Sequence, residues 1–135
     1  MVEPPEPSRV DERGIRPPDA FAIELRDAGD GAAVVVLEGE LDLAAAPALR
    51  ERLAQATAGA PRGVVLDMAE VSFVDSSALR ELLRAHAGVR ERGGTLVLAA
   101  VGPTVARLLE LTRTTDVLAL APDVDQALTR LAATP

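Results

Sequence analysis

The sequence contains no cysteine, lysine, tryptophan or tyrosine, and its only aromatic side chains are Phe21 and Phe73. Without cysteine the chain forms no disulfide, thiolate metal site or Fe–S cluster, and it has no cysteine nucleophile. Apolar residues nevertheless make up 48% of the sequence. We therefore expect a core built almost entirely from aliphatic side chains.

Cationic charge comes only from 14 arginines, against 21 acidic residues, so the net charge is -7 at pH 7. The arginines are spread along the sequence and form no basic stripe, which argues against nucleic acid and anionic membranes as partners. No run of about 20 apolar residues is present that would span a membrane. We expect a cytoplasmic location.

The 135 residues suit one domain preceded by a tail. Residues 1–19 hold five of the ten prolines and eight charged residues, and they contain no apolar run typical of a signal peptide. We predict that residues 1–19 are a disordered, Pro-rich, charged tail and that residues 20–135 form the domain.

From residue 20 onward, strand-like and helix-like patterns alternate. The expected strands cover residues 21–25, 33–37, 64–67, 95–99 and 117–120, and the expected helices begin near Pro47, Ser76, Pro103 and Asp123. This order, β-β-α-β-α-β-α-β-α, predicts an α/β domain with a mixed, mostly parallel sheet of four to five strands and about four helices. The opening hairpin, turning at Asp30-Gly31, supplies an antiparallel edge strand.

The segment around Asp75-Ser76-Ser77 is the most informative for function, because two hydroxyls lie where a helix begins. A helix needs only one cap, which either Ser76 or Ser77 can supply, and the other hydroxyl is then free. The positive end of the helix dipole also tolerates a phosphate group there. Capping and phosphorylation are both open from these residues alone.

Two motifs, Gly39-Glu40-Leu41-Asp42 and Val71-Ser72-Phe73-Val74-Asp75-Ser76-Ser77-Ala78-Leu79, closely resemble those of the bacterial STAS-domain anti-sigma factor antagonists. The segments 64–67, 92–96 and 105–112 extend the resemblance over about residues 20–132. It implies a partner switch that regulates transcription, for example in a stress response. The unphosphorylated protein binds an anti-sigma factor that is a serine kinase and releases the sigma factor, phosphorylation ends the binding, and a serine phosphatase restores it.

The resemblance implies that Ser76 is the phosphate acceptor. Ser77 is then the expected helix cap and a secondary candidate for the phosphate. It places the partner-binding surface on Asp42, Asp75, Ser76, Ser77 and Ala78. It implies no catalytic residue, metal or cofactor, and a monomer or weak homodimer. A phosphate on Ser76 beside two carboxylates would repel an acidic partner, and a loss of ~3 kcal/mol weakens binding about a hundredfold.

The chain departs from the family pattern at two places. Ala78 stands where glycine is usual, and we expect its methyl group to crowd an approaching kinase. Arg113-Thr114-Thr115 stands where glycine commonly follows the third helix, so we expect that helix to lack a left-handed terminator.

Three alternatives differ in class from a phosphorylated switch. A receiver-like domain could use Asp67 at the expected end of a buried strand, but it requires a lysine; we expect Asp67 to organise a loop. A serine hydrolase would need His86 as its base, but this residue is expected to be a half-buried position on a helix, and no nucleophile elbow is present. The third is a STAS-type scaffold of a transporter or signalling assembly that binds its partner without being phosphorylated.

Overall fold

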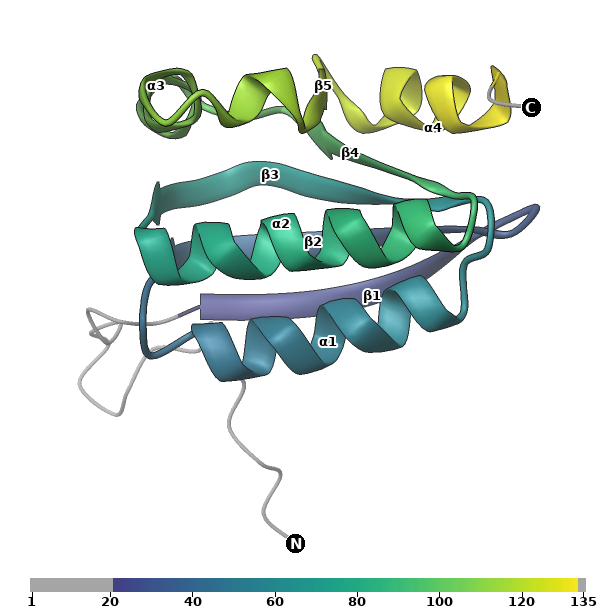
Figure 1. Cartoon of the computed structure of the whole chain (residues 1–135), viewed down its shortest axis with the longest axis horizontal. Coiled ribbons are helices and arrows are strands. Elements are labelled where there is room, and N and C mark those ends of the chain that lie inside the picture. The colour runs from purple at the N-terminus through teal and green to yellow at the C-terminus, as the bar shows by residue number, and fades with distance from the viewer. Residues whose placement is uncertain (1–20, 134–135) are drawn as a thin grey trace, which may run out of the picture.

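The computed structural model describes residues 21–133, in which five strands and four α-helices alternate (Figure 1). The elements are β1 (Phe21–Gly29), β2 (Ala32–Leu41), α1 (Ala46–Ala58), β3 (Gly63–Val74), α2 (Ser76–Glu91), β4 (Thr95–Ala99), α3 (Pro103–Leu111), the 3-10 turn η1 (Thr114–Asp116), β5 (Ala119–Ala121) and α4 (Val124–Ala133). This order confirms the predicted one. The predicted tail, residues 1–19, lies outside the described residues.

The strands form one sheet in the order β1-β2-β3-β4-β5. β1 pairs antiparallel with β2, and the other neighbours pair parallel, as the helical connections between them require. The antiparallel edge predicted from the hairpin is confirmed. Because β2 and β3 are parallel, both end at the same edge of the sheet, where α1 and α2 begin (Figure 1).

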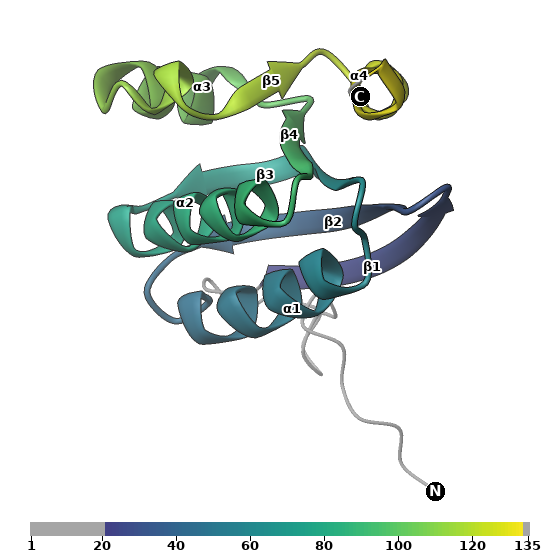
Figure 2. The ribbon, with the colours of Figure 1, turned by 45° about the vertical axis from the view of Figure 1, so that its right-hand side comes forward.

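Helices cover both faces of the sheet. α1 and α2 run side by side over one face, and α4 covers the other (Figures 1 and 2). In β3, Val64 and Leu66 join the core under α1 and α2, while Val65 joins the core under α4. Among the described residues every buried apolar side chain is Ala, Val, Leu or Met, which confirms the aliphatic core. In this part of the chain no helix is long and apolar enough to cross a membrane.

β3 is longer than predicted, and the expected strand end at Asp67 is wrong. Two β-bulges keep the chain paired with β2 as far as Val74. At the first bulge Met68 and Ala69 lie opposite Leu37, and the Ala69 N–H donates to the Asp67 carboxylate at 3.1 Å. Asp67 therefore organises a bulge within the strand, and no loop follows it.

The end of α3 is a second correction. The segment Arg113–Thr115 was expected to leave this helix without a left-handed terminator, but Arg113 itself adopts a φ of 61°. The Thr114 hydroxyl donates to the Leu109 carbonyl at 3.1 Å and holds the last turn in place. This local bonding offsets the cost of about 1 kcal/mol that a residue other than glycine incurs in that conformation.

Candidate functional site

The carboxyl ends of β2 and β3 bring the two sequence motifs together. Leu41 pairs with Val74, and the N–H of Asp75 donates to the Leu41 carbonyl at 3.1 Å. Asp42 and Asp75, which are 33 positions apart in the sequence, therefore leave neighbouring strand ends at the edge where α1 and α2 begin. We call this edge, with Asp42, Asp75, Ser76 and Ser77, the switch edge.

The backbone conformation at Gly39 explains why the first motif starts with glycine. The backbone φ of this residue is +91°, a conformation that residues other than glycine rarely adopt. Gly39 lies where the register between β2 and β3 shifts for the second time. The Ser72 hydroxyl, on the bulged strand, donates to the Gly39 carbonyl at 3.5 Å. The glycine thus sets the direction of the last residues of β2, which lead into Asp42 at the switch edge.

Asp42 shapes the loop between β2 and α1. Its carboxylate accepts hydrogen bonds from the N–H groups of Ala44 at 3.0 Å and Ala45 at 3.2 Å, and the residue is half-buried. The carboxylate is therefore held in one position beside the start of α2.

Asp75 is the N-cap of α2, so the assignment of that role to Ser77 is wrong. The Asp75 carboxylate accepts from the Ala78 N–H at 3.0 Å, and its backbone is extended, with φ −100° and ψ −178°. Aspartate caps helices as well as serine does. Because the cap is one residue earlier than the serines, Ser76 and Ser77 become the first two residues of the helix, and neither hydroxyl is needed to cap it.

The two serines face different surroundings. Ser76 is exposed, whereas Ser77 is half-buried and lines a cavity of about 340 Å³ together with Leu43, Arg50 and Arg80. A phosphate on Ser76 would meet the solvent and an approaching partner. A phosphate on Ser77 would meet two guanidinium groups of the same chain.

Ala78 does not belong to the exposed part of the switch edge. Its side chain is fully buried at the start of α2. The methyl group therefore packs into the core, where it cannot crowd a kinase, and the expectation that it would do so is wrong.

Sequence reasoning missed two exposed apolar residues beside these serines. Leu43, in the loop before α1, is 72% exposed, and Phe73, at the end of β3, is 44% exposed. Large exposed apolar side chains near a polar site are typical of protein-binding surfaces. A signal existed for Phe73, because it is one of two aromatic residues in the chain and lies within the second motif.

Removing the cap separates the roles of Asp75 and Ser77. We expect Asp75→Ala to lower the free energy of unfolding by about 1 kcal/mol, because the first turn of α2 loses its acceptor. Asp75→Asn retains an acceptor and should stay within a few tenths of a kcal/mol of the wild type. Ser77→Ala should also change the free energy of unfolding by only a few tenths of a kcal/mol. Urea unfolding of the three variants measures this, and a larger loss for Ser77→Ala than for Asp75→Ala would contradict the assignment.

A buried carboxylate ties α2 to α1 one helical turn beyond Ser77. Glu81 is 5% exposed, and Arg50 of α1 donates to it twice, from Nε at 3.1 Å and from Nη2 at 3.0 Å. Arg84 adds a third bond at 3.2 Å. The Arg50 hydrogen bonds lower the pKa of Glu81, and burial opposes them in part.

The lowered pKa of Glu81 predicts a loss of stability in acid. Its folded-state pKa lies below the ordinary 4.5, so its contribution is present above about pH 4.5 and disappears as the pH falls through the folded-state value. We expect the difference in unfolding free energy between the wild type and Glu81→Gln to be constant from pH 7 to about pH 5 and to shrink below that. Denaturant titrations across this range measure it. A difference that grows in acid would contradict the account.

His86 shows no arrangement suited to catalysis. It is half-buried on α2, as predicted, and burial followed by repulsion from Arg90 lowers its pKa. Its Nδ1 atom is buried without a hydrogen-bond partner in the described part of the chain, so no acid orients it as a base. Residues 21–133 also contain no group of three His, Cys, Asp or Glu that could hold a metal ion.

Comparison with known proteins gives the same class as the fold and the switch edge. The model of the STAS domain family matches residues 26–127. An anti-sigma-B factor antagonist from Listeria monocytogenes is 30% identical over 100 residues, covering 73% of this chain and 86% of that protein. The anti-sigma-B factor antagonist of Bacillus subtilis is 33% identical over 85 residues, covering 62% and 76%.

Among solved structures, the crystal structure of an anti-sigma factor antagonist from Mycobacterium paratuberculosis superposes with a TM-score of 0.77 at 31% identity, covering 86% of this chain and 97% of that one. The fold is therefore that of a STAS domain. The chain belongs to the family of STAS-domain anti-sigma factor antagonists.

Proposed function

We propose that this protein is a phosphorylation-controlled, non-catalytic antagonist that binds an anti-sigma factor in the cytoplasm and so releases a sigma factor. The observation that carries the proposal is the exposed hydroxyl of Ser76 at the first residue of α2, next to the capping carboxylate of Asp75 and the fixed strand end at Asp42. The likeness to relatives named anti-sigma factor antagonists supports the choice of partner.

Ser76 is the acceptor we propose for the partner's kinase activity, because its hydroxyl is accessible and is not used by the cap. The helix dipole stabilises the added phosphate within the protein itself, so the fold survives the modification. At the surface the phosphate joins two carboxylates, and together they repel acidic groups of the partner and raise the cost of desolvation on docking. The modification thus acts on binding and leaves folding intact. A serine phosphatase would reverse it.

Leu43 and Phe73 supply apolar contact area to the same surface. Both are exposed beside the serines, and removing apolar surface from water favours association. The charge set by Ser76 then decides whether this area is buried against the partner. The binding surface we propose consists of Asp42, Asp75, Ser76 and Ser77 together with these two apolar residues.

Release of a sigma factor tests the proposal. The purified chain is added to the complex of an anti-sigma factor and its sigma factor from the same cell, and free sigma factor is measured by size-exclusion chromatography. We expect release by the unphosphorylated chain and none after incubation of the chain with the anti-sigma factor and ATP. Equal release in both states would refute the switch, and no release from any such complex would refute the function.

A further inference from the structure

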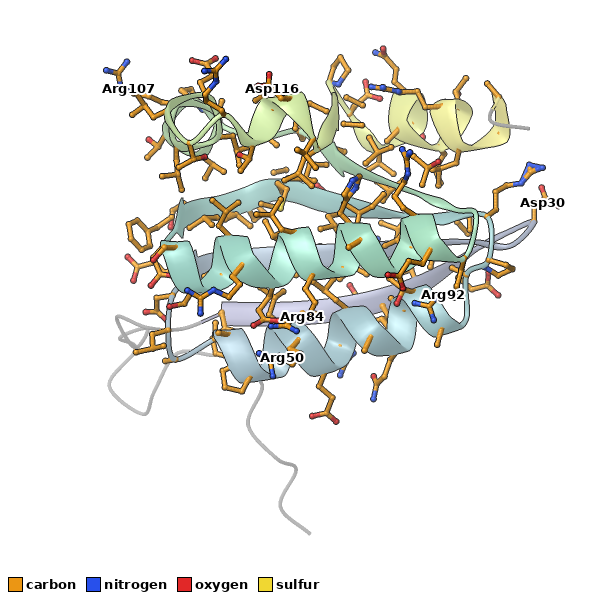
Figure 3. All side chains as sticks on the ribbon, in the orientation of Figure 1. Asp30, Arg50, Arg84, Arg92, Arg107 and Asp116 are labelled. Atoms are coloured by element: carbon orange, nitrogen blue, oxygen red, sulfur yellow. The ribbon has the colours of Figure 1, made fainter. Side chains whose placement is uncertain are left out.

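Two adjacent cavities lie along the seam between α1 and α2, starting at the switch edge. One of about 340 Å³ lies beside Ser77 and one of about 140 Å³ lies farther along, and the ion-paired Arg50 and Glu81 line both. Figure 3 shows Arg50 and Arg84 converging on this seam and Arg92 at its far end. We call this feature the α1–α2 groove; its charged residues are Arg50, Arg80, Glu81, Arg84 and Arg92.

The groove concentrates positive charge in an acidic protein. Its lining carries four guanidinium groups and one carboxylate, Glu81, which is already bound by two of them. Arg80 has no ion-pair partner among residues 21–133. Within the described part of the chain, the Arg92 side chain donates only to a neutral group, the hydroxyl of Thr57 at 3.0 Å. The groove thus has a surplus of three positive charges, whereas the whole chain has a net charge of -7.

The floor of the groove allows a polypeptide to lie close to the helices. It is formed largely by small or apolar residues, among them Leu53, Ala54, Ala85 and Gly88. From Ser77 to Arg92 the helical rise of ~1.5 Å per residue gives a length of about 22 Å. An extended peptide of about seven residues covers that distance at ~3.3 Å per residue.

We propose that the α1–α2 groove binds an acidic, extended segment of about seven residues from the anti-sigma factor. In this groove Arg50 donates two parallel hydrogen bonds to the carboxylate of Glu81. The groove therefore already binds a carboxylate of its own chain in the geometry that suits an acidic side chain of a partner. The groove is continuous with the switch edge through Ser77, so a partner docked on Ser76 has its next contacts there. The inference rests on the proposed function only in assigning the segment to the anti-sigma factor.

A peptide probe tests the groove without the anti-sigma factor. Fluorescein-labelled heptaglutamate is titrated with the full chain and followed by anisotropy, and amide NMR shifts of the full chain locate the bound peptide. We expect shifts confined to α1 and α2, and at least tenfold weaker binding for the double variant Arg80→Glu/Arg92→Glu. The matched control Arg62→Glu/Arg107→Glu makes the same charge change outside the groove and should reduce affinity less than threefold.

Several results would overturn the inference. One is amide NMR shifts on elements other than α1 and α2, and another is an equal loss of peptide affinity in both double variants. The same NMR shifts with inorganic phosphate at equal concentration, or tighter binding of a seven-nucleotide oligothymidine than of the peptide, would also overturn it. If Arg80→Glu/Arg92→Glu does not fold, Arg80→Gln/Arg92→Gln takes its place, with an expected loss of at least threefold. Peptide binding without any sigma-factor release would refute the proposed function and leave the groove intact. Sigma-factor release without peptide binding would refute the groove proposal and leave the proposed function intact.

Discussion

Ser76→Asp is expected to weaken binding to the anti-sigma factor at least tenfold, and stoichiometric phosphorylation of Ser76 about a hundredfold. A tenfold loss corresponds to about 1.4 kcal/mol and a hundredfold loss to about 2.7 kcal/mol. Aspartate adds one negative charge beside Asp42 and Asp75, and a phosphate adds nearly two. Ser76→Ala adds none and should retain the affinity of the unphosphorylated protein. Titration calorimetry with the purified anti-sigma factor measures all three.

Two controls separate a local charge effect from a loss of folding or a general change in charge. Gln126→Glu adds the same charge in the first turn of α4, which covers the other face of the sheet, and should change affinity less than twofold. Ser77→Asp places the charge among Arg50 and Arg80, which compensate it, so its loss should be smaller than that of Ser76→Asp. The thermal midpoint of Ser76→Asp should not fall, because the dipole of α2 favours an acid there. Equal affinities of Ser76→Asp and Ser76→Ala would rule out the mechanism.

Gly63→Ala should destabilise the protein by about 3 kcal/mol or more. Gly63 opens β3 with a φ of +150°, a conformation that L side chains rarely adopt, and a Cβ there would overlap the backbone carbonyl oxygen of Thr95. It would also lie 2.9 Å from Leu131 of α4. The carbonyl cannot move without breaking the pairing of β3 with β4, so strain and overlap add. Guanidinium unfolding measures the loss.

Gly88→Ala is the matched control for this substitution. Gly88 lies within α2, where a Cβ meets only the end of the Arg92 side chain at 3.6 Å, so alanine should stabilise the protein by about 0.8 kcal/mol through its higher helix propensity. We therefore expect the free energy of unfolding to fall in Gly63→Ala and to rise in Gly88→Ala. A Gly63→Ala protein as stable as the wild type would show that the opening of β3 is not as constrained as described.

The sheet and its helices follow from the sequence because their periodic patterns are strong. The β-branched run near Val35 and the aliphatic runs near Leu66 and Leu98 specify burial on one or both faces of the sheet. The turn residues Asp30-Gly31 specify the hairpin between β1 and β2. Patterns of this kind survive in the fold because burial of these side chains dominates the energetics.

The end of β3 could not be predicted from the same patterns. Each bulge inserts one residue and shifts the alternation of buried and exposed positions, so the segment between Asp67 and Phe73 looks like a loop. The pairing with β2, which is a contact between distant parts of the chain, keeps this segment in the sheet. The local sequence carries no sign of that pairing.

The two motifs could be found in the sequence, but the geometry of the site could not be predicted from it. The strand end that carries Asp75 was expected to be a loop, and only the pairing of β3 with β2 places it beside Asp42. The identity of the cap was not decided by residue type, because Asp75 and Ser77 are equally good acceptors and only the backbone at Asp75 is extended. The α1–α2 groove could not be predicted from the sequence either. Its arginines come from two helices that are separated by β3 in the sequence and come together only by packing.

Mapping phosphate on the protein taken from its own cells tests the central claim most directly. Trypsin cuts after Arg62 and Arg80, so one peptide carries Ser72, Ser76 and Ser77, and its fragment ions distinguish the three. We predict a phosphate on Ser76 in cells whose sigma factor is held inactive and its loss in cells where that sigma factor is active. A peptide without phosphate on Ser76 in both conditions would contradict the account and leave a STAS domain that binds its partner without a phosphorylation switch.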